Sequence, residues 1–114
     1  TYPEPHMPAY AVAILKETRM NDDIRTYLER IDQTLVPYEG RFVIHGGPYV
    51  WLEGEPTGDL IAIEFPDLEQ ALHWYNSAAY QEIKPLRTEN SVGTVFLAPG
   101  VSPNHRSTDI LAKG

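Results

Sequence analysis

The chain has no cysteine and few basic residues. Its 114 residues include 9 Lys and Arg against 16 Asp and Glu, which gives a formal net charge of −7. The absence of cysteine excludes a disulfide scaffold, a thiolate metal site and a cysteine nucleophile, and it fits a reducing compartment. The acidic balance argues against binding to nucleic acid, because affinity for a phosphate backbone depends on cationic side chains. It argues equally against anionic membrane surfaces.

Long apolar runs are also missing. No stretch approaches the roughly 20 apolar residues that span a bilayer. The first residues, TYPEPHMPAY, lack the basic region and apolar core of a secretory signal. We therefore expect a cytoplasmic protein with no membrane partner.

The length and composition fit one globular domain, since 42% of the residues are hydrophobic. We expect residues 1–8 to be an N-terminal extension and residues 9–100 to form the domain. Residues 101–114 are polar and contain proline, so they are expected to form a C-terminal tail that is extended or partly disordered.

Several short runs have the composition of β-strands. Residues 9–18, AYAVAILKET, predict a strand buried at its centre, and residues 41–45, RFVIH, predict a second. Residues 49–53 could continue this second strand as an edge ribbon beyond a bulge at the paired glycines. Residues 59–65, DLIAIEF, alternate in the manner of a third strand, and residues 92–98 predict a fourth.

Two segments have helical periodicity. Asn21 is a candidate N-cap for the first helix, and Pro37 and Gly40 are expected to end it. The apolar positions of this helix recur at helical spacing. Those positions are Ile24, Tyr27, Leu28, Ile31 and Leu35. Asp67 predicts the cap of a second helix, interrupted at residues 76–78 and resumed as a short helix that contains Pro85. Its expected apolar face is Leu68, Ala71, Leu72 and Tyr75.

The resulting order, β-α-β-β-α-β, predicts an α+β fold of the ferredoxin-like type, with a four-stranded antiparallel sheet and the helices on one face. The other face of that sheet then carries alternating apolar residues without cover. An exposed apolar patch of this size marks an interface, so we expect a homodimer that pairs two sheets face to face.

The stretch FPDLEQALHWYNSAAYQEIKPLR, from Phe65 to Arg87, has recognisable spaced elements. They are Phe65-Pro66, Ala71, Trp74-Tyr75, Ser77, Tyr80-Gln81 and Leu86-Arg87, preceded in the chain by Tyr38, Gly40-Arg41-Phe42, Gly46-Gly47 and Leu52-Glu53-Gly54. Together they resemble a small bacterial family known as domain of unknown function 1330. The resemblance implies a ferredoxin-like domain of the dimeric α/β-barrel type, a homodimer through the sheets, and no established activity. His45 stands where many relatives carry arginine, and the tail beyond Gly100 has no counterpart in the pattern.

Two residues are candidates for acid–base catalysis. His45, at a strand end beside two glycines, is either a general base at the mouth of a pocket or a hydrogen-bonded surface histidine. Glu64, between Ile63 and Phe65, is either a carboxylate inside the pocket, coupled to His45, or a paired glutamate at the dimer face.

Three further residues are candidates for ligand binding. Trp74 lies one position off the apolar stripe and could line a cavity, while Tyr80 could point its hydroxyl at a ligand; the alternative is that both are core. Arg87 could hold a ligand carboxylate through two hydrogen bonds. Its alternatives are a salt bridge to Glu82 or Glu89, or a charge that complements the helix dipole.

No metal or cofactor is expected. The four histidines show no ligand spacing, the glycines lack a phosphate-binding fingerprint, and the serines lack a nucleophile elbow. The leading hypothesis is that the protein binds a small aromatic or carboxylate metabolite, with acid–base chemistry on it left open. One alternative, by fold analogy, is a cofactor-free monooxygenase or isomerase. The other is a noncatalytic interaction or stress module.

Overall fold

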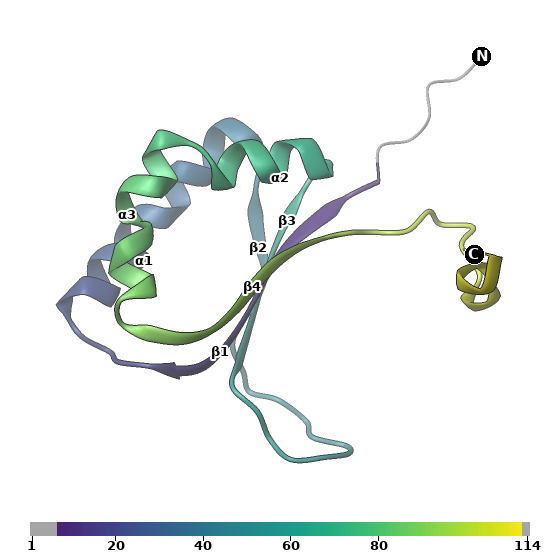
Figure 1. Cartoon of the computed structure of the whole chain (residues 1–114), viewed down its shortest axis with the longest axis horizontal. Helices are drawn as coiled ribbons and strands as arrows, with labels where there is room; N and C mark the ends of the chain where they lie inside the picture. The colour runs from purple at the N-terminus through teal and green to yellow at the C-terminus, as the bar shows by residue number, and fades with distance from the viewer. Residues whose placement is uncertain (1–6, 113–114) are drawn as a thin grey trace.

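The protein has the predicted ferredoxin-like α+β architecture, in a computed structural model that describes residues 7–112. The strands and helices are β1 (Ala9–Thr18), α1 (Asp22–Leu35), β2 (Arg41–His45), β3 (Asp59–Phe65), α2 (Leu68–Tyr75), α3 (Ala78–Thr88) and β4 (Ser91–Pro99). The sheet is antiparallel with strand order β2-β3-β1-β4. Figure 1 shows all three helices on one side of this sheet. Most of the expected N-terminal extension lies outside the described residues.

Helix α1 begins and ends where the sequence predicts. The Asn21 side chain accepts a hydrogen bond from the main-chain N–H of Ile24 at 3.1 Å, and two aspartates occupy the first turn, where the helix dipole favours anions. The helix buries Ile24, Tyr27, Ile31, Thr34 and Leu35 against the sheet and α3. Leu28, which was expected on this face, is 41% exposed.

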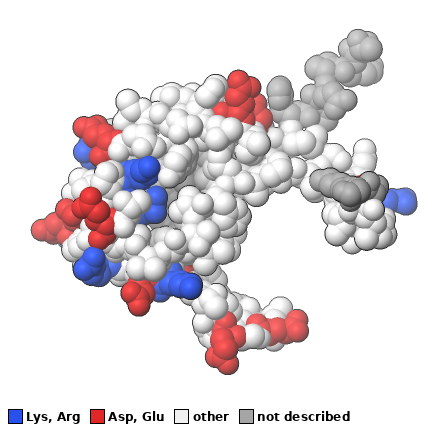
Figure 2. Space-filling view, in the orientation of Figure 1, with Lys and Arg blue, Asp and Glu red and all other residues white. Residues whose placement is uncertain are grey.

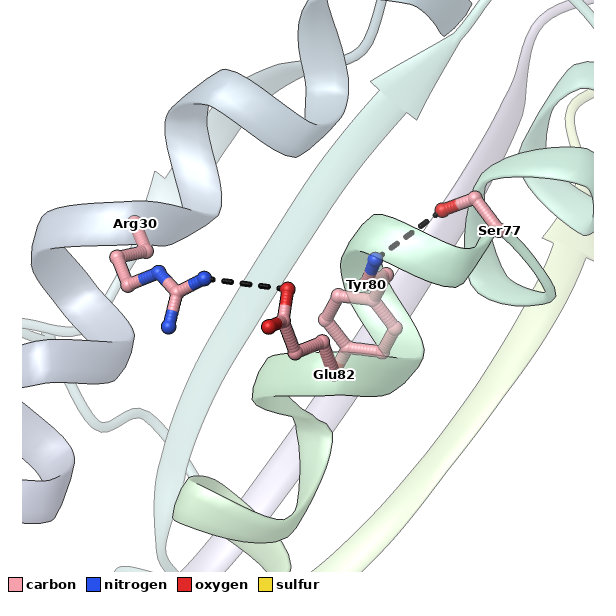
Figure 3. A network of polar contacts seen from close by, with 4 residues as sticks. All are labelled: Arg30, Ser77, Tyr80 and Glu82. Atoms are coloured by element: carbon pink, nitrogen blue, oxygen red, sulfur yellow. Dashed lines mark hydrogen bonds and ion pairs between the residues drawn. The ribbon is translucent and has the colours of Figure 1, made fainter.

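The buried face of α2 differs from the expected one. Ala71 and Trp74 are the buried residues, whereas Leu68 and Leu72 are exposed and Tyr75 is half-buried. The Trp74 indole ring packs on Phe65, with 5.4 Å between ring centroids, and this large contact fixes the rotation of the helix. The expected interruption is present: α2 ends at Asn76, and the Ser77 hydroxyl accepts a hydrogen bond from the N–H of Tyr80 to open α3 (Figure 3).

The expected edge ribbon at residues 49–53 is absent, and residues 46–58 instead form one long connection, here called the β2–β3 loop. Gly46 has φ +81°, a conformation that ends the strand. The Tyr49 hydroxyl then accepts a hydrogen bond from the N–H of Leu60 at 2.9 Å. This hydrogen bond to the Tyr49 side chain occupies the N–H of Leu60, which could otherwise have bonded to an edge strand.

The core lies between the sheet and the helices. Its largest fully buried side chains are Tyr80, Phe65 and Ile83. Successive residues of a strand face opposite sides of the sheet. Ala11 and Ile63 face this core, whereas their chain neighbours Val12 and Ala62 face away from it.

The opposite face of the sheet is largely apolar, apart from Glu64 and the Tyr10 and Arg41 side chains bonded to it, and has no helix over it in the described residues. Ile14, Ile44 and Phe96 lie on it, each about two-fifths exposed. Figure 2 shows that the charged groups gather over the helices and on the β2–β3 loop, which leaves the side of the body away from the helices largely uncharged. We call this surface the open sheet face.

The C-terminal tail leaves the end of β4 and runs away from the body (Figure 1). It was expected to be extended or partly disordered, and it ends in a short 3₁₀ segment at Ser107–Ala112. Among the described residues, no helix is long and apolar enough to cross a membrane.

Candidate functional site

A cavity of about 280 Å³ lies between the sheet and the helices. Ala11 and Ala13 of β1 form its floor together with Ile61 and Ile63 of β3. The volume is near the lower end of the range of small-molecule sites, about 300–1,000 Å³. The small alanine side chains on the central strand leave this space below the helices.

Two tyrosines and one arginine form the polar end of the cavity, and we call them the Tyr–Arg cluster. The hydroxyls of Tyr27 on α1 and Tyr80 on α3 are 2.8 Å apart, and Arg87 Nη2 donates to the Tyr80 hydroxyl at 3.4 Å. Each hydroxyl carries one proton, and the hydrogen bond between the two tyrosines uses the proton of only one of them. One hydroxyl proton therefore remains free for an oxygen atom that enters the cavity.

Burial sets the protonation of this cluster. Desolvation and the neighbouring Tyr80 hydroxyl raise the pKa of Tyr27 above its usual value, although Arg87 opposes the shift. Burial alone would lower the pKa of Arg87, but Tyr80 and Tyr27 outweigh it and raise that pKa overall. At neutral pH the cluster thus presents the neutral hydroxyl of Tyr27 and the cation of Arg87.

Arg87 forms neither of the ion pairs considered from the sequence, but it does lie in the last turn of α3, where a cation complements the helix dipole. Glu82 pairs with Arg30 of α1 at 3.2 Å, as Figure 3 shows, and the main-chain oxygen of Glu89 accepts from Arg19. Among residues 7–112, no carboxylate lies within ion-pair distance of the Arg87 guanidinium. A half-buried cation of this kind is available to an anion from outside the chain.

Trp74 forms one wall of the cavity with its ring alone. Its indole N–H donates to Thr34 Oγ1 at 2.9 Å, and that hydroxyl donates to the main-chain oxygen of Ile31 at 2.6 Å. The ring lies 4.2 Å from that of Tyr80, centroid to centroid. Trp74 is thus both core and cavity wall, with no polar group left for a ligand.

His45 lies at the rim of the same cavity. Its imidazole stacks on Phe42, with 4.6 Å between ring centroids and 22° between the planes. The residue ends β2 and is exposed to solvent. It can therefore meet a ligand held in the cavity and exchange protons with water.

Glu64 does not share this cavity. It alternates with Ile63 and Phe65 and so faces the opposite side of the sheet, where its carboxylate accepts from Tyr10 at 3.2 Å and from Arg41 Nε at 2.9 Å. The structure thus brings together four of the sequence candidates, His45, Trp74, Tyr80 and Arg87, and separates Glu64 from them.

The sequence analysis did not single out Tyr27 or Thr34 as part of the site. Tyr27 was taken only as a member of the apolar stripe of α1. A tyrosine on a stripe of isoleucine and leucine does carry a signal, because a buried hydroxyl must find a partner. Among the described residues, no three His, Asp or Glu side chains are grouped so that they could hold a metal ion.

A family model described as "Domain of unknown function (DUF1330)" matches residues 8–101. This chain belongs to that family. No curated protein matches the chain. The DUF1330 assignment carries no established activity, so any function has to be argued from the geometry above.

Solved structures share the fold of this DUF1330 protein at low identity. One is the RPA0582 protein of unknown function from Rhodopseudomonas palustris, with 14% identity, 86% of this chain and 85% of that chain covered, and a TM-score of 0.61. The methylated RPA0582 protein matches with 13% identity, 88% and 85% coverage, and a TM-score of 0.62. A protein from Nitrosomonas europaea, named as a candidate antibiotic biosynthesis monooxygenase, matches with 12% identity, 92% and 100% coverage, and a TM-score of 0.49. At these identities the likeness to RPA0582 concerns the fold alone, and the third match supports no inference.

Proposed function

We propose that the cavity binds a small metabolite with an apolar or aromatic body and one anionic oxygen group, such as a carboxylate. The observation that carries this proposal is Arg87, a half-buried guanidinium beside the cavity with no carboxylate partner among residues 7–112. Burying an unpaired charge costs free energy, so a cation held in this way is best explained by an anion that joins it.

The hydrogen-bonding capacity of the cluster supports an anion over other polar ligands. The Arg87 guanidinium is a donor with five N–H groups, and the tyrosine pair adds one free hydroxyl proton. A carboxylate only accepts, so it matches such a set, whereas an ammonium group would face a like charge. The wall formed by Trp74 and the floor formed in part by Ile61 and Ile63 suit an apolar body.

Acid–base chemistry on this ligand is the second candidate function, and His45 is the observation that favours it. It shares the cavity with the Tyr–Arg cluster, and histidine is the side chain that most often serves as a general base in enzymes. Glu64 lies outside the cavity, so we leave it out of the proposed site.

We also propose that the protein is a cytoplasmic homodimer paired through the open sheet faces. Ile14, Ile44 and Phe96 support the pairing, since a contiguous apolar surface on a sheet favours association. The absence of cysteine supports the location. Light scattering at micromolar concentration should give twice the chain mass, and a monomer would contradict the pairing.

A thermal-shift comparison tests the ligand class. Benzoate and hexanoate should raise the melting temperature, while benzamide and benzylamine should not. A ligand present at about 100 times its Kd adds roughly 2.7 kcal/mol of stability, which is easily resolved. Arg87→Gln should abolish the response to the acids.

Arg30→Gln is the matched control, because it removes an exposed arginine on the neighbouring helix whose ion-pair partner among residues 7–112 is Glu82. This variant should respond to the acids as the parent protein does. Equal stabilisation by benzoate and benzamide, or a full response in Arg87→Gln, would exclude the proposed anion site.

A further inference from the structure

Two ordered segments of the chain expose apolar side chains away from the body. One is the β2–β3 loop, and the other is the tail, residues 101–112. Figure 1 shows both projecting from the sheet on the side away from the helices. Apolar groups that project from the body in this way are typical of surfaces that bind a partner.

The β2–β3 loop is held in shape at its base. The Tyr49 hydroxyl bonds the N–H of Leu60 at 2.9 Å, and the Tyr49 ring lies 5.2 Å from that of Trp51. Beyond this anchor Val50 is 87% exposed and Leu52 is 88% exposed. Two glutamates, Glu53 and Glu55, follow and make the tip of the loop acidic (Figure 2).

The tail is held in shape by its own residues. The N–H of Arg106 donates to Asp109 Oδ2 at 3.0 Å, and the N–H of His105 donates to the oxygen of Ser102 at 3.0 Å. Within the described part of the chain, residues 101–112 make no hydrogen bond to the rest of the protein. Ile110 and Leu111 nevertheless remain mostly exposed, and Arg106 is exposed beside them.

The two segments leave opposite ends of the sheet. The register pairs Ala9 with Pro99, so the tail starts at the end of the sheet where β1 begins. It pairs Leu15 with Asp59, so the β2–β3 loop lies toward the end where β1 finishes. Within one chain the length of β1 therefore separates the apolar groups of the tail from those of the loop.

A two-fold dimer through the open sheet faces can bring these segments together in two ways. If the symmetry axis runs along the strands, each segment meets its own copy, and the acidic loop tips repel each other. If the axis runs across the strands, the two ends of the sheet exchange, and the tail of one subunit meets the loop of the other. In that arrangement Arg106 approaches Glu53 and Glu55, and apolar groups cover one another.

We propose that the symmetry axis runs across the strands and that the tail of each subunit docks on the β2–β3 loop of a second copy of this chain. The proposal rests on the homodimer proposed above. It adds two features that pairing through the open sheet faces does not by itself require. They are the direction of the symmetry axis and an arm exchange, in which the tail of each subunit docks on the loop of the other.

The absence of native cysteine makes the test direct. Leu52→Cys and Ile110→Cys place single thiols on the loop and the tail, and a third protein carries both substitutions. After mild oxidation the double variant should run as a covalent dimer on a non-reducing gel, while each single variant stays monomeric. A double variant with Leu52→Cys and Leu72→Cys is the matched control, because Leu72 is exposed on the helix side, and it should stay monomeric.

Other outcomes overturn the proposal in recognisable ways. Covalent dimers from the single variants would show that like segments meet, so the axis runs along the strands. An internal disulfide in the double variant would show that the tail docks on its own chain. If light scattering gives a dimer but the double variant forms no cross-link, the arm exchange is wrong and the sheet pairing survives. If it gives a monomer, both proposals fail.

Discussion

The hydrogen bond between Trp74 and Thr34 gives the sharpest test of how the cavity wall is held. The indole N–H of Trp74 is buried and donates to Thr34 Oγ1 at 2.9 Å. Thr34→Val keeps the branched shape of the side chain but removes the acceptor. We expect the packing to survive and the indole N–H to be left without a partner.

The cost follows from the burial of that N–H group. A buried donor that loses its acceptor destabilises a protein by about 1–3 kcal/mol. For 114 residues the unfolding entropy is about 0.24 kcal/mol/K, so that 1 kcal/mol corresponds to about 4 °C in the melting temperature. Thr34→Val should therefore lower Tm by about 4–12 °C.

Thermal unfolding, monitored by circular dichroism, measures the effect of Thr34→Val in the parent protein and in the Trp74→Phe variant. In Trp74→Phe the N–H is absent, so adding Thr34→Val should cost about 1 kcal/mol or less, from the lost bond to Ile31 alone. The same loss of stability in both backgrounds would refute the reasoning, because it would show that Thr34 does not act through the Trp74 indole.

Three further predictions concern the tyrosine pair, a buried amide and a crowded glycine. Because burial and Tyr80 raise the pKa of Tyr27 above 10.0, folded protein keeps a proton that unfolded chain releases above that pH. Tyr27 should then make stability fall by about 1.4 kcal/mol per pH unit above about pH 10, and Tyr27→Phe should reduce the slope by that amount in urea titrations. Asn90→Asp should cost about 2–3 kcal/mol by chemical denaturation, because the buried Asn90 amide donates to an aspartate and to a main-chain oxygen. Gly93→Ala should cost about 1–3 kcal/mol in the same assay, since its Cβ would lie 2.8 Å from Leu15 Cα.

The sequence predicted what depends on local chemistry. The Asn21 and Asp67 caps are present as expected, because a capping side chain bonds an N–H only three residues away. The alternation of Ile63, Glu64 and Phe65 was also correct, since the period of a strand is two. These signals need no knowledge of the rest of the chain.

The errors concern choices that distant residues decide. Nothing near Trp74 in the sequence shows that Phe65 and Thr34 would draw its ring into the core in place of Tyr75. The partner of Arg87 was equally undetermined, because Arg30 on another helix takes Glu82. The residues of the cavity were thus largely recognisable from the sequence, whereas their partners were not.

The alanines on β1 have a consequence for how such proteins diverge. Ala11 and Ala13 keep the cavity open by the size of their side chains, with no special backbone geometry. A single change of either to leucine or valine would narrow this space and leave the strand pairing intact. Descendants of one ancestor could therefore gain, lose or resize a binding site through single residue substitutions, while inheriting the same fold.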